Sequence, residues 1–271
     1  MSDWIANARM YSVTPAAEAA WQGLLAHIAH DAGIALVYEA YAAPQPLERL
    51  WARADLGAVL MCGFPVALRL APVVPIAAPI PAAPWAGGRA VYRSNLIVRR
   101  EAPFRTLEDT FGTRAGFTVA HSQSGFNAFR HLLLKHRSAA RPKLYATMRG
   151  DLVTARAILD AVLAGDIDIG PLDAYWHLLL EHHAPELTTG VRVLATTELT
   201  PMPAFVAAAA APPAMVNALR AAFLSADRQP WFDDFRKPLQ LAGFAAASAS
   251  DYTLYFGWDC EAIAAGYELP A

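Results

Sequence analysis

Apolar residues recur along this chain with two different spacings. Near the N-terminus they return every three or four positions, which predicts an amphipathic helix from Thr14-Pro15 to Gly33. Thr14 is a favourable N-cap, and Pro15 suits the first helical position. Residues 56–61 form instead a nearly continuous apolar run, which is typical of a strand buried on both faces of a parallel sheet.

The same two patterns alternate over most of the sequence. Alternation of strands and helices predicts an α/β fold with mostly parallel sheets flanked by helices. In such folds ligands bind at the carboxyl ends of the strands. Strands are predicted over 8–11, 34–38, 56–61, 90–99, 117–120, 167–169 and 191–195. Further helices are predicted over 46–54, within 103–111, from about Gly125, and over 152–164, 173–182, 213–225 and 231–235.

Composition narrows the classes of function. The chain has 271 residues, of which 55% are hydrophobic and 17% charged, so a disordered protein is excluded. The net charge of -2 provides no long-range attraction to nucleic acid or to an anionic membrane. Prolines interrupt the apolar stretch 71–86, so we expect no membrane insertion. Pairing of Cys62 with Cys260 stays open, because sequence does not give the distance between them.

The first residues, MSDWIANARMYS, lack the basic start and apolar run of an export signal. This predicts a cytoplasmic protein, or a periplasmic one if an export signal has been removed.

The most informative segment for chemistry is Ser122-Gln123-Ser124-Gly125. It lies between a predicted buried strand and a predicted helix, where the first backbone N–H groups have no partner inside the helix. Such groups form an anion site, to which Ser122, Gln123 and Ser124 can add side-chain donors. Gly125 would let a ligand approach the backbone. The alternative is that Ser124 only caps the helix.

Other chemistry is disfavoured by missing motifs. The phosphate-binding GxxxxGK[ST], the dinucleotide-binding GxGxxG and the serine-hydrolase GxSxG patterns are all absent. The histidines lack HExxH spacing or neighbouring cysteine pairs. We therefore expect no catalytic residue, no metal and no cofactor.

Four segments in order resemble the phosphonate-type periplasmic substrate-binding proteins of ABC transporters, a branch of the type II periplasmic-binding-protein fold. They span nearly the whole chain. The segments are Met10-Tyr11 before the Thr-Pro helix, Cys62-Gly63-Phe64-Pro65, Tyr92 to Val98 with Pro103 and Leu107, and Ser122 to Phe126 with the downstream Ala164 to Asp173.

The resemblance implies two α/β lobes that close over a ligand, with residues 1–93 and 195–271 in lobe I and 94–194 in lobe II. It implies a small oxyanion ligand, phosphonate- or phosphate-like, held in the cleft between the lobes, and a possible partner in the transporter permease. The implied ligand-binding residues are Tyr11, Tyr92, Ser94, Ser122, Gln123, Ser124, Gly125 and Asp173, the last of which can meet an amino group of the ligand.

The chain departs from this family at one place. Family members usually have Gly-Ser-His before the second-lobe helix, whereas this chain has Asp151 to Ala155 without histidine.

Two alternatives to a transport protein stay open at this point. They are a cytoplasmic ligand sensor, and an enzyme on the same fold similar to a thiamine-pyrimidine synthase.

Overall fold

The structure, a computed structural model, describes residues 4–271. The chain divides into two compact units. The first unit contains the chain up to Tyr92 together with Pro201–Thr253. The second contains Arg93–Thr200 and Leu254–Ala271. The C-terminal segment from Leu254 thus belongs to the second unit, whereas the predicted division places 195–271 with the N-terminal lobe.

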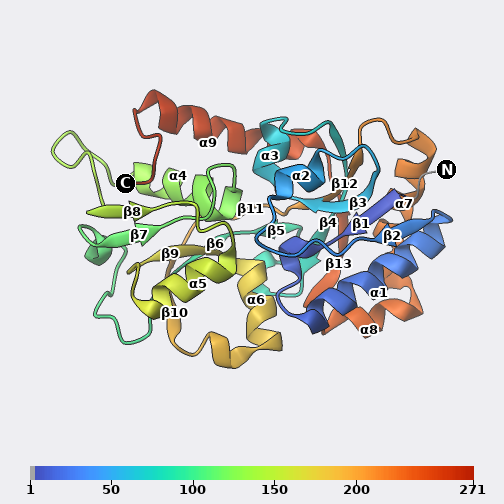
Figure 1. The fold of residues 1–271 in the computed structure, drawn as a ribbon, viewed down its shortest axis with the longest axis horizontal. Helices are drawn as coiled ribbons and strands as arrows, with labels where there is room; N and C mark the ends of the chain where they lie inside the picture. Colours follow the sequence, from blue (N-terminus) through green and yellow to red (C-terminus); the bar gives the residue numbers. More distant parts are fainter. Residues whose placement is uncertain (1–3) are drawn as a thin grey trace. The chain divides into compact units, whose positions relative to one another are not determined.

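The first unit is built on a six-stranded sheet with the order β13-β4-β12-β3-β1-β2. Its helix α1 packs against α7, which in turn packs against β4 and β13 (Figure 1). Its strands are β1 (Trp4–Asn7), β2 (Leu36–Tyr38), β3 (Leu56–Met61), β4 (Val73–Pro81), β12 (Ala204–Ala208) and β13 (Leu241–Ala246), with the short β5 (Val91–Tyr92) outside this sheet. Its α-helices are α1 (Pro15–Ala32), α2 (Leu47–Trp51), α3 (Gly63–Ala67), α7 (Pro213–Ser225) and α8 (Asp233–Arg236). Its 3-10 helices are η1 (Arg9–Tyr11), η2 (Pro84–Ala86), η6 (Ala226–Arg228), η7 (Pro230–Phe232) and η8 (Ala249–Tyr252).

The α/β class is confirmed, but the prediction of mostly parallel sheets is wrong. Only β2 and β3 run parallel to β1, while β12 is antiparallel to β3 and β4, and β13 is antiparallel to β4. Burial on both faces produces the same apolar run in either direction. Strand direction is therefore decided by the long connections of the fold and not by local sequence.

Two predicted elements of the first unit are confirmed at the level of single residues. Helix α1 begins where Thr14 Oγ1 accepts a hydrogen bond from the Ala17 N–H at 3.2 Å, and it ends at Gly33 with φ of 65°. A left-handed conformation of this kind favours glycine. Strand β3 covers Leu56–Met61, and all six residues are buried.

Strand β4 is the largest element that sequence patterns missed. It is nine residues long and lies between β12 and β13, yet it contains Pro75, Pro79 and Pro81. Proline cannot donate to a sheet ladder and argues against a central strand. The pairing of β4 shifts register next to Pro75 on the β12 side and next to Pro81 on the β13 side, and such irregularities are places where a strand tolerates proline. Arg220 Nη2 donates to the Pro75 carbonyl at 2.9 Å, which satisfies one backbone acceptor.

The second unit contains a three-stranded antiparallel sheet, β10-β6-β9, and a parallel pair, β7-β8. The strands are β6 (Ser94–Arg99), β7 (Arg114–Gly116), β8 (Thr147–Arg149), β9 (Gly170–Asp173) and β10 (Val191–Thr196), and β11 (Thr200–Pro201) lies at the boundary between the units. The helices are η3 (Glu108–Thr110), the π-helix η4 (Gln123–Asn127), α4 (Ala128–Leu134), α5 (Ala155–Ala164), α6 (Ala174–His183), η5 (Pro185–Leu187) and α9 (Thr253–Ala264).

Several predicted boundaries are wrong by a few residues. The predicted strand 8–11 is instead the 3-10 helix after β1, in which the Tyr11 N–H donates to the Ala8 carbonyl at 2.9 Å. The predicted strands 117–120 and 167–169 are displaced to β7 and β9. Apolar runs mark what is buried, whereas strand ends depend on which backbone groups find partners.

The C-terminal helix α9 is attached to the second unit by polar contacts with η4 and α4. Asn127 Nδ2 donates to the Tyr255 carbonyl at 3.0 Å, and Arg130 forms an ion pair with Asp259. The Arg130 side chain is only 3% exposed. Tyr267, after α9, packs in the core of this unit. These contacts explain why the tail from Leu254 belongs here and not with the N-terminal segment.

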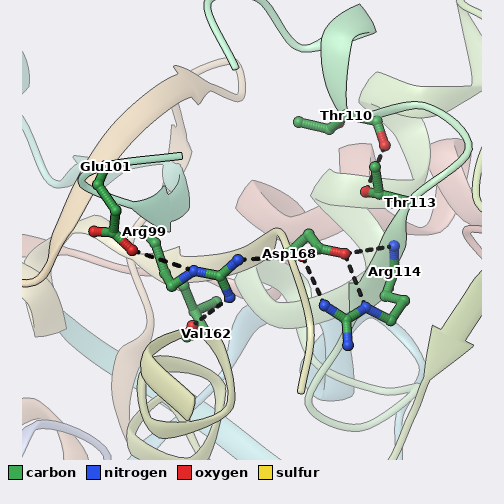
Figure 2. A network of polar contacts seen from close by, with 7 residues as sticks. All are labelled: Arg99, Glu101, Thr110, Thr113, Arg114, Val162 and Asp168. Atoms are coloured by element: carbon green, nitrogen blue, oxygen red, sulfur yellow. Dashed lines mark hydrogen bonds and ion pairs between the residues drawn. The ribbon is translucent and has the colours of Figure 1, made fainter. Parts of the chain in front are cut away.

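An ion-pair cluster around Asp168 fixes the loop that leads into β9 (Figure 2). Asp168 accepts two hydrogen bonds from the Arg114 guanidinium, both at 2.9 Å, and lies 3.6 Å from Arg99 Nη2. Arg114 belongs to β7 and Arg99 to β6. The hydrogen bonds and charge of Arg114 hold the pKa of Asp168 below its usual range. The cluster thereby joins three strand ends next to the segment that carries Asp173.

Candidate anion-binding site

The Ser122–Gly125 turn opens the helical segment formed by η4 and α4. Ser122 is the N-cap, and its Oγ accepts a hydrogen bond from the Gly125 N–H at 3.0 Å. The capping residue is therefore Ser122, and the prediction of Ser124 as an alternative cap is wrong. The segment begins with a π-turn, a feature frequent at functional sites, and continues as a regular α-helix.

A buried polar network holds the start of this helix rigid. Gln123 Oε1 accepts a hydrogen bond from Asn127 Nδ2 at 2.9 Å, and Arg130 Nη2 donates to Asn127 Oδ1 at 3.0 Å. All three side chains are buried. The network fixes the backbone of the turn and binds the carboxamide oxygen of Gln123 inside the unit. Sequence reasoning missed Asn127 and Arg130, although Gln123 and Asn127 are four positions apart, the spacing of neighbours on a helix.

Gly125 has a packing role that the sequence did not reveal. A Cβ at this position would lie 2.0 Å from Thr118 Oγ1 and 2.9 Å from Ser122 Oγ. The Thr118 N–H donates to the Gly125 carbonyl at 3.2 Å, which keeps the two backbones together. Glycine is thus required by the protein's own packing, and a direct approach of ligand to Gly125 stays a prediction.

Three elements bring Ser94, Ser124 and Asp173 together. Ser94 and Asp173 are cross-strand partners in β6 and β9. Ser94 Oγ donates to the Ser124 carbonyl at 2.7 Å, and Ser124 Oγ donates to Asp173 Oδ2 at 3.5 Å. The Ser94 N–H donates to Thr197 Oγ1 at 2.8 Å, a contact that sequence reasoning missed. The predicted residues of the second unit therefore form one continuous cluster.

Asp173 also caps a helix. Its Oδ1 accepts hydrogen bonds from the N–H groups of Tyr175 at 2.9 Å and Trp176 at 3.1 Å, so that α6 begins at Ala174. A carboxylate at a helix N-terminus is favoured by the helix dipole. Burial, and secondly the Asp173 charge, raise the pKa of Tyr175 well above its usual value. The Oδ2 atom is directed toward Ser124, so it marks the acidic edge of the cluster.

Two hydrogen-bond donors of the turn have no acceptor among residues 4–271. They are the Ser122 hydroxyl proton and the Ser124 backbone N–H. Both residues are partly exposed. An oxyanion could accept from both donors, while an amino group on the same ligand could meet Asp173. The arrangement thus suits a small ligand with an anionic end.

The two predicted aromatic residues belong to the first unit. Tyr11 is the last residue of η1, and Tyr92 is the last residue of β5. Both side chains are buried, with 1% exposure each. Their contact with ligand stays a prediction.

Within residues 4–271, no three or more His, Cys, Asp or Glu side chains are grouped so that they could hold a metal ion. His177 is buried beside the cluster, where its Nδ1 lies 3.2 Å from Asn95 Nδ2. Burial lowers the pKa of His177, so the neutral ring is favoured.

No helix in the described part of the chain combines the length and apolar character needed to cross a membrane.

One family profile matches most of the chain. The profile of the family described as "ABC transporter, phosphonate, periplasmic substrate-binding protein" matches residues 12–252. No curated protein sequence gives a significant match.

Solved structures show the same fold at low identity. A binding protein component of an ABC phosphonate transporter from Pseudomonas aeruginosa is similar with a TM-score of 0.80, at 14% identity over 98% of this chain and 88% of that chain. PhnD1 from Prochlorococcus marinus, in complex with methylphosphonate, has a TM-score of 0.77, at 14% identity over 96% and 97% of the two chains. A protein from Xanthomonas citri bound to ATP has a TM-score of 0.66, at 16% identity over 98% of each chain.

Proposed function

The chain belongs to the phosphonate family of periplasmic substrate-binding proteins of ABC transporters, and we propose that it holds a small oxyanion at the Ser122–Gly125 turn for such a transporter. The family is non-enzymatic, so the function is capture and release of a ligand and not turnover. The observation that carries the proposal is the pair of available donors, the Ser122 hydroxyl and the Ser124 N–H, on a turn whose backbone is fixed by buried hydrogen bonds.

The acidic neighbour narrows the class of ligand. Asp173 Oδ2 lies 3.5 Å from Ser124 Oγ, so a plain dianion at the turn would face a carboxylate. Two negative charges close together repel, whereas a cationic group on the ligand would be attracted to Asp173. We therefore favour a ligand with an oxyanion at one end and an amino group at the other. An aminoalkyl phosphonate has this chemistry.

The proposal extends to the first unit and to the location of the protein. Tyr11 and Tyr92 would contribute aromatic contacts to the same ligand, held between two lobes as the family resemblance implies. The partner would be the permease of an ABC transporter, and the compartment would be the periplasm. The similar Prochlorococcus structure contains methylphosphonate, which supports a phosphonate group as the anionic end of the ligand.

A calorimetric titration of wild type and variants tests the site. The ligands are 2-aminoethylphosphonate, methylphosphonate, phosphate, sulfate and acetate. We expect Ser122→Ala combined with Ser124→Ala to weaken binding of the best ligand at least about tenfold, because the Ser122 hydroxyl contact to a charged group is lost and the Ser124 hydroxyl no longer donates to Asp173. Asp173→Asn should weaken the aminophosphonate and leave methylphosphonate unchanged or improved.

A matched control separates binding from folding. Ser122→Ala removes an N-cap, which costs about 1 kcal/mol of stability in itself. Thr154 caps α5 in the same unit, where its Oγ1 accepts from the Ala157 N–H at 3.1 Å. Thr154→Ala should therefore lose similar stability and keep full affinity. Undiminished affinity in the double serine variant would refute the site.

A further inference from the structure

Positive charge is unevenly distributed in the second unit. Residues 111–150 contain no aspartate or glutamate. The same segment contains seven lysines and arginines, which are Arg114, Arg130, Lys135, Arg137, Arg141, Lys143 and Arg149. Any neutralisation of these side chains must come from other parts of the chain.

Four of the seven are neutralised in this way. The ion pairs are Arg114 with Asp168, Arg130 with Asp259, Lys135 with Glu198, and Arg149 with Asp166. A fifth, Arg137, serves the fold: it donates to the carbonyls of Pro142 at 2.8 Å and Ala265 at 3.1 Å, and its guanidinium lies 4.2 Å from the centre of the Tyr267 ring.

The two remaining cations, Arg141 and Lys143, line the same surface pocket. Neither forms an ion pair with any residue between 4 and 271. The pocket has a volume of about 360 Å³, and its other lining residues are Phe111, Gly112, Leu144, Tyr145 and Ala146. This volume falls in the range of small-molecule sites, roughly 300–1,000 Å³.

The pocket combines an apolar wall with a cationic rim. The Arg141 guanidinium lies 5.8 Å from the centre of the Phe111 ring. Backbone hydrogen bonds between Ser138 and Arg141, at 3.2 and 3.0 Å, close the turn that carries Arg141. Glu108, on the preceding 3-10 helix η3, lies 3.3 Å from His136 Nδ1.

We propose that this pocket is a second ligand site, separate from the Ser122 turn, which binds a small phosphate monoester with an apolar body. The guanidinium and the ammonium together match the double negative charge of a phosphate monoester, and guanidinium binds phosphate in a bidentate manner. The Phe111 ring provides the apolar surface on which the body of the ligand lies. The inference does not depend on what the Ser122 turn binds.

The test is a titration with phenyl phosphate, followed by amide chemical shifts in the full chain. The protein carries Ser122→Ala and Ser124→Ala, so that binding at the turn does not contribute. We expect saturable shifts at the amides of Gly112, Leu144 and Ala146. Adding Arg141→Gln and Lys143→Gln should raise the dissociation constant at least about tenfold, because two charge-assisted contacts are lost.

A matched pair of substitutions controls for net charge. Arg105→Gln with Arg228→Gln removes the same charge from exposed positions outside the pocket, and it should leave the affinity within about twofold. Inorganic phosphate should bind more weakly than phenyl phosphate, and neutral benzyl alcohol should give no saturable shift. The proposal is overturned if these amides do not respond, if the pocket variant binds as wild type does, or if inorganic phosphate binds as tightly as phenyl phosphate.

Discussion

Gly125 is the position at which a single methyl group tests the packing of the candidate site most directly. In Gly125→Ala the new Cβ would lie 2.0 Å from Thr118 Oγ1 and 2.9 Å from Thr118 Cγ2. Contacts this short cannot persist, and Thr118 cannot withdraw easily because its N–H is bonded to the Gly125 carbonyl. Overpacking of a buried site typically costs 1–3 kcal/mol, and we expect the upper end of that range, about 3 kcal/mol.

Thermal unfolding followed by circular dichroism measures this cost. For a protein of this size, about 3 kcal/mol corresponds to a decrease in Tm of roughly 6–12 °C. The control is Gly257→Ala in α9, where a Cβ would have no neighbour within 4 Å. Alanine is favoured over glycine inside a helix, so this control should raise stability by up to about 1 kcal/mol.

A second-site substitution tests the cause of the destabilisation. Thr118→Ala removes two of the three atoms closest to the new Cβ and leaves Ser122 Oγ at 2.9 Å. Thr118 Oγ1 is buried without a hydrogen-bond partner among residues 4–271, so its loss should cost little. In this background Gly125→Ala should cost less than about 1 kcal/mol, a coupling of about 2 kcal/mol. The reasoning is refuted if Gly125→Ala is as stable as wild type, or if Thr118→Ala gives no rescue.

Three further substitutions probe the contacts that shape the two units. Arg114 holds the pKa of Asp168 below its usual value. The ionised carboxylate therefore stabilises the fold at pH values above its unfolded-state pKa of about 3.9, and this stabilisation is lost as pH falls through the pKa of the folded state. Asp168→Asn should therefore lower Tm at pH 7, and this deficit should shrink as pH falls toward 2; an equal deficit at both pH values would contradict this. Asp259→Ala leaves the buried Arg130 guanidinium without its carboxylate and should cost about 3 kcal/mol in denaturant unfolding, whereas a cost below about 1 kcal/mol would show that the ion pair does not hold α9. Tyr252→Phe removes the buried hydroxyl that donates to the Met202 carbonyl at 2.9 Å and should lower the free energy of unfolding by about 1–2 kcal/mol. An unchanged Tm would contradict this expectation.

Local sequence was sufficient wherever a short segment contains its own structural determinants. Thr14-Pro15 and Gly33 set the ends of α1, and the apolar run of Leu56–Met61 set β3. The Ser122–Gly125 turn was also found, because a capped helix start after a buried segment is a local pattern. The order of such segments along the chain was enough to indicate the family.

Tertiary structure decided what depends on partners distant in sequence. The direction of β12 and β13, the use of a proline-containing segment as the central strand β4, and the attachment of α9 to the second unit all follow from long-range pairing. The Ser122–Gly125 turn changed in meaning for the same reason. From the sequence we predicted that Gly125 lets a ligand approach the backbone, whereas in the fold Thr118 packs against Gly125. The donors of the turn that lack a protein acceptor are the Ser122 hydroxyl and the Ser124 N–H among residues 4–271. Hydrogen bonds and steric contacts form between atoms that are close in space, and a pattern along the sequence does not tell which distant residues are close in space.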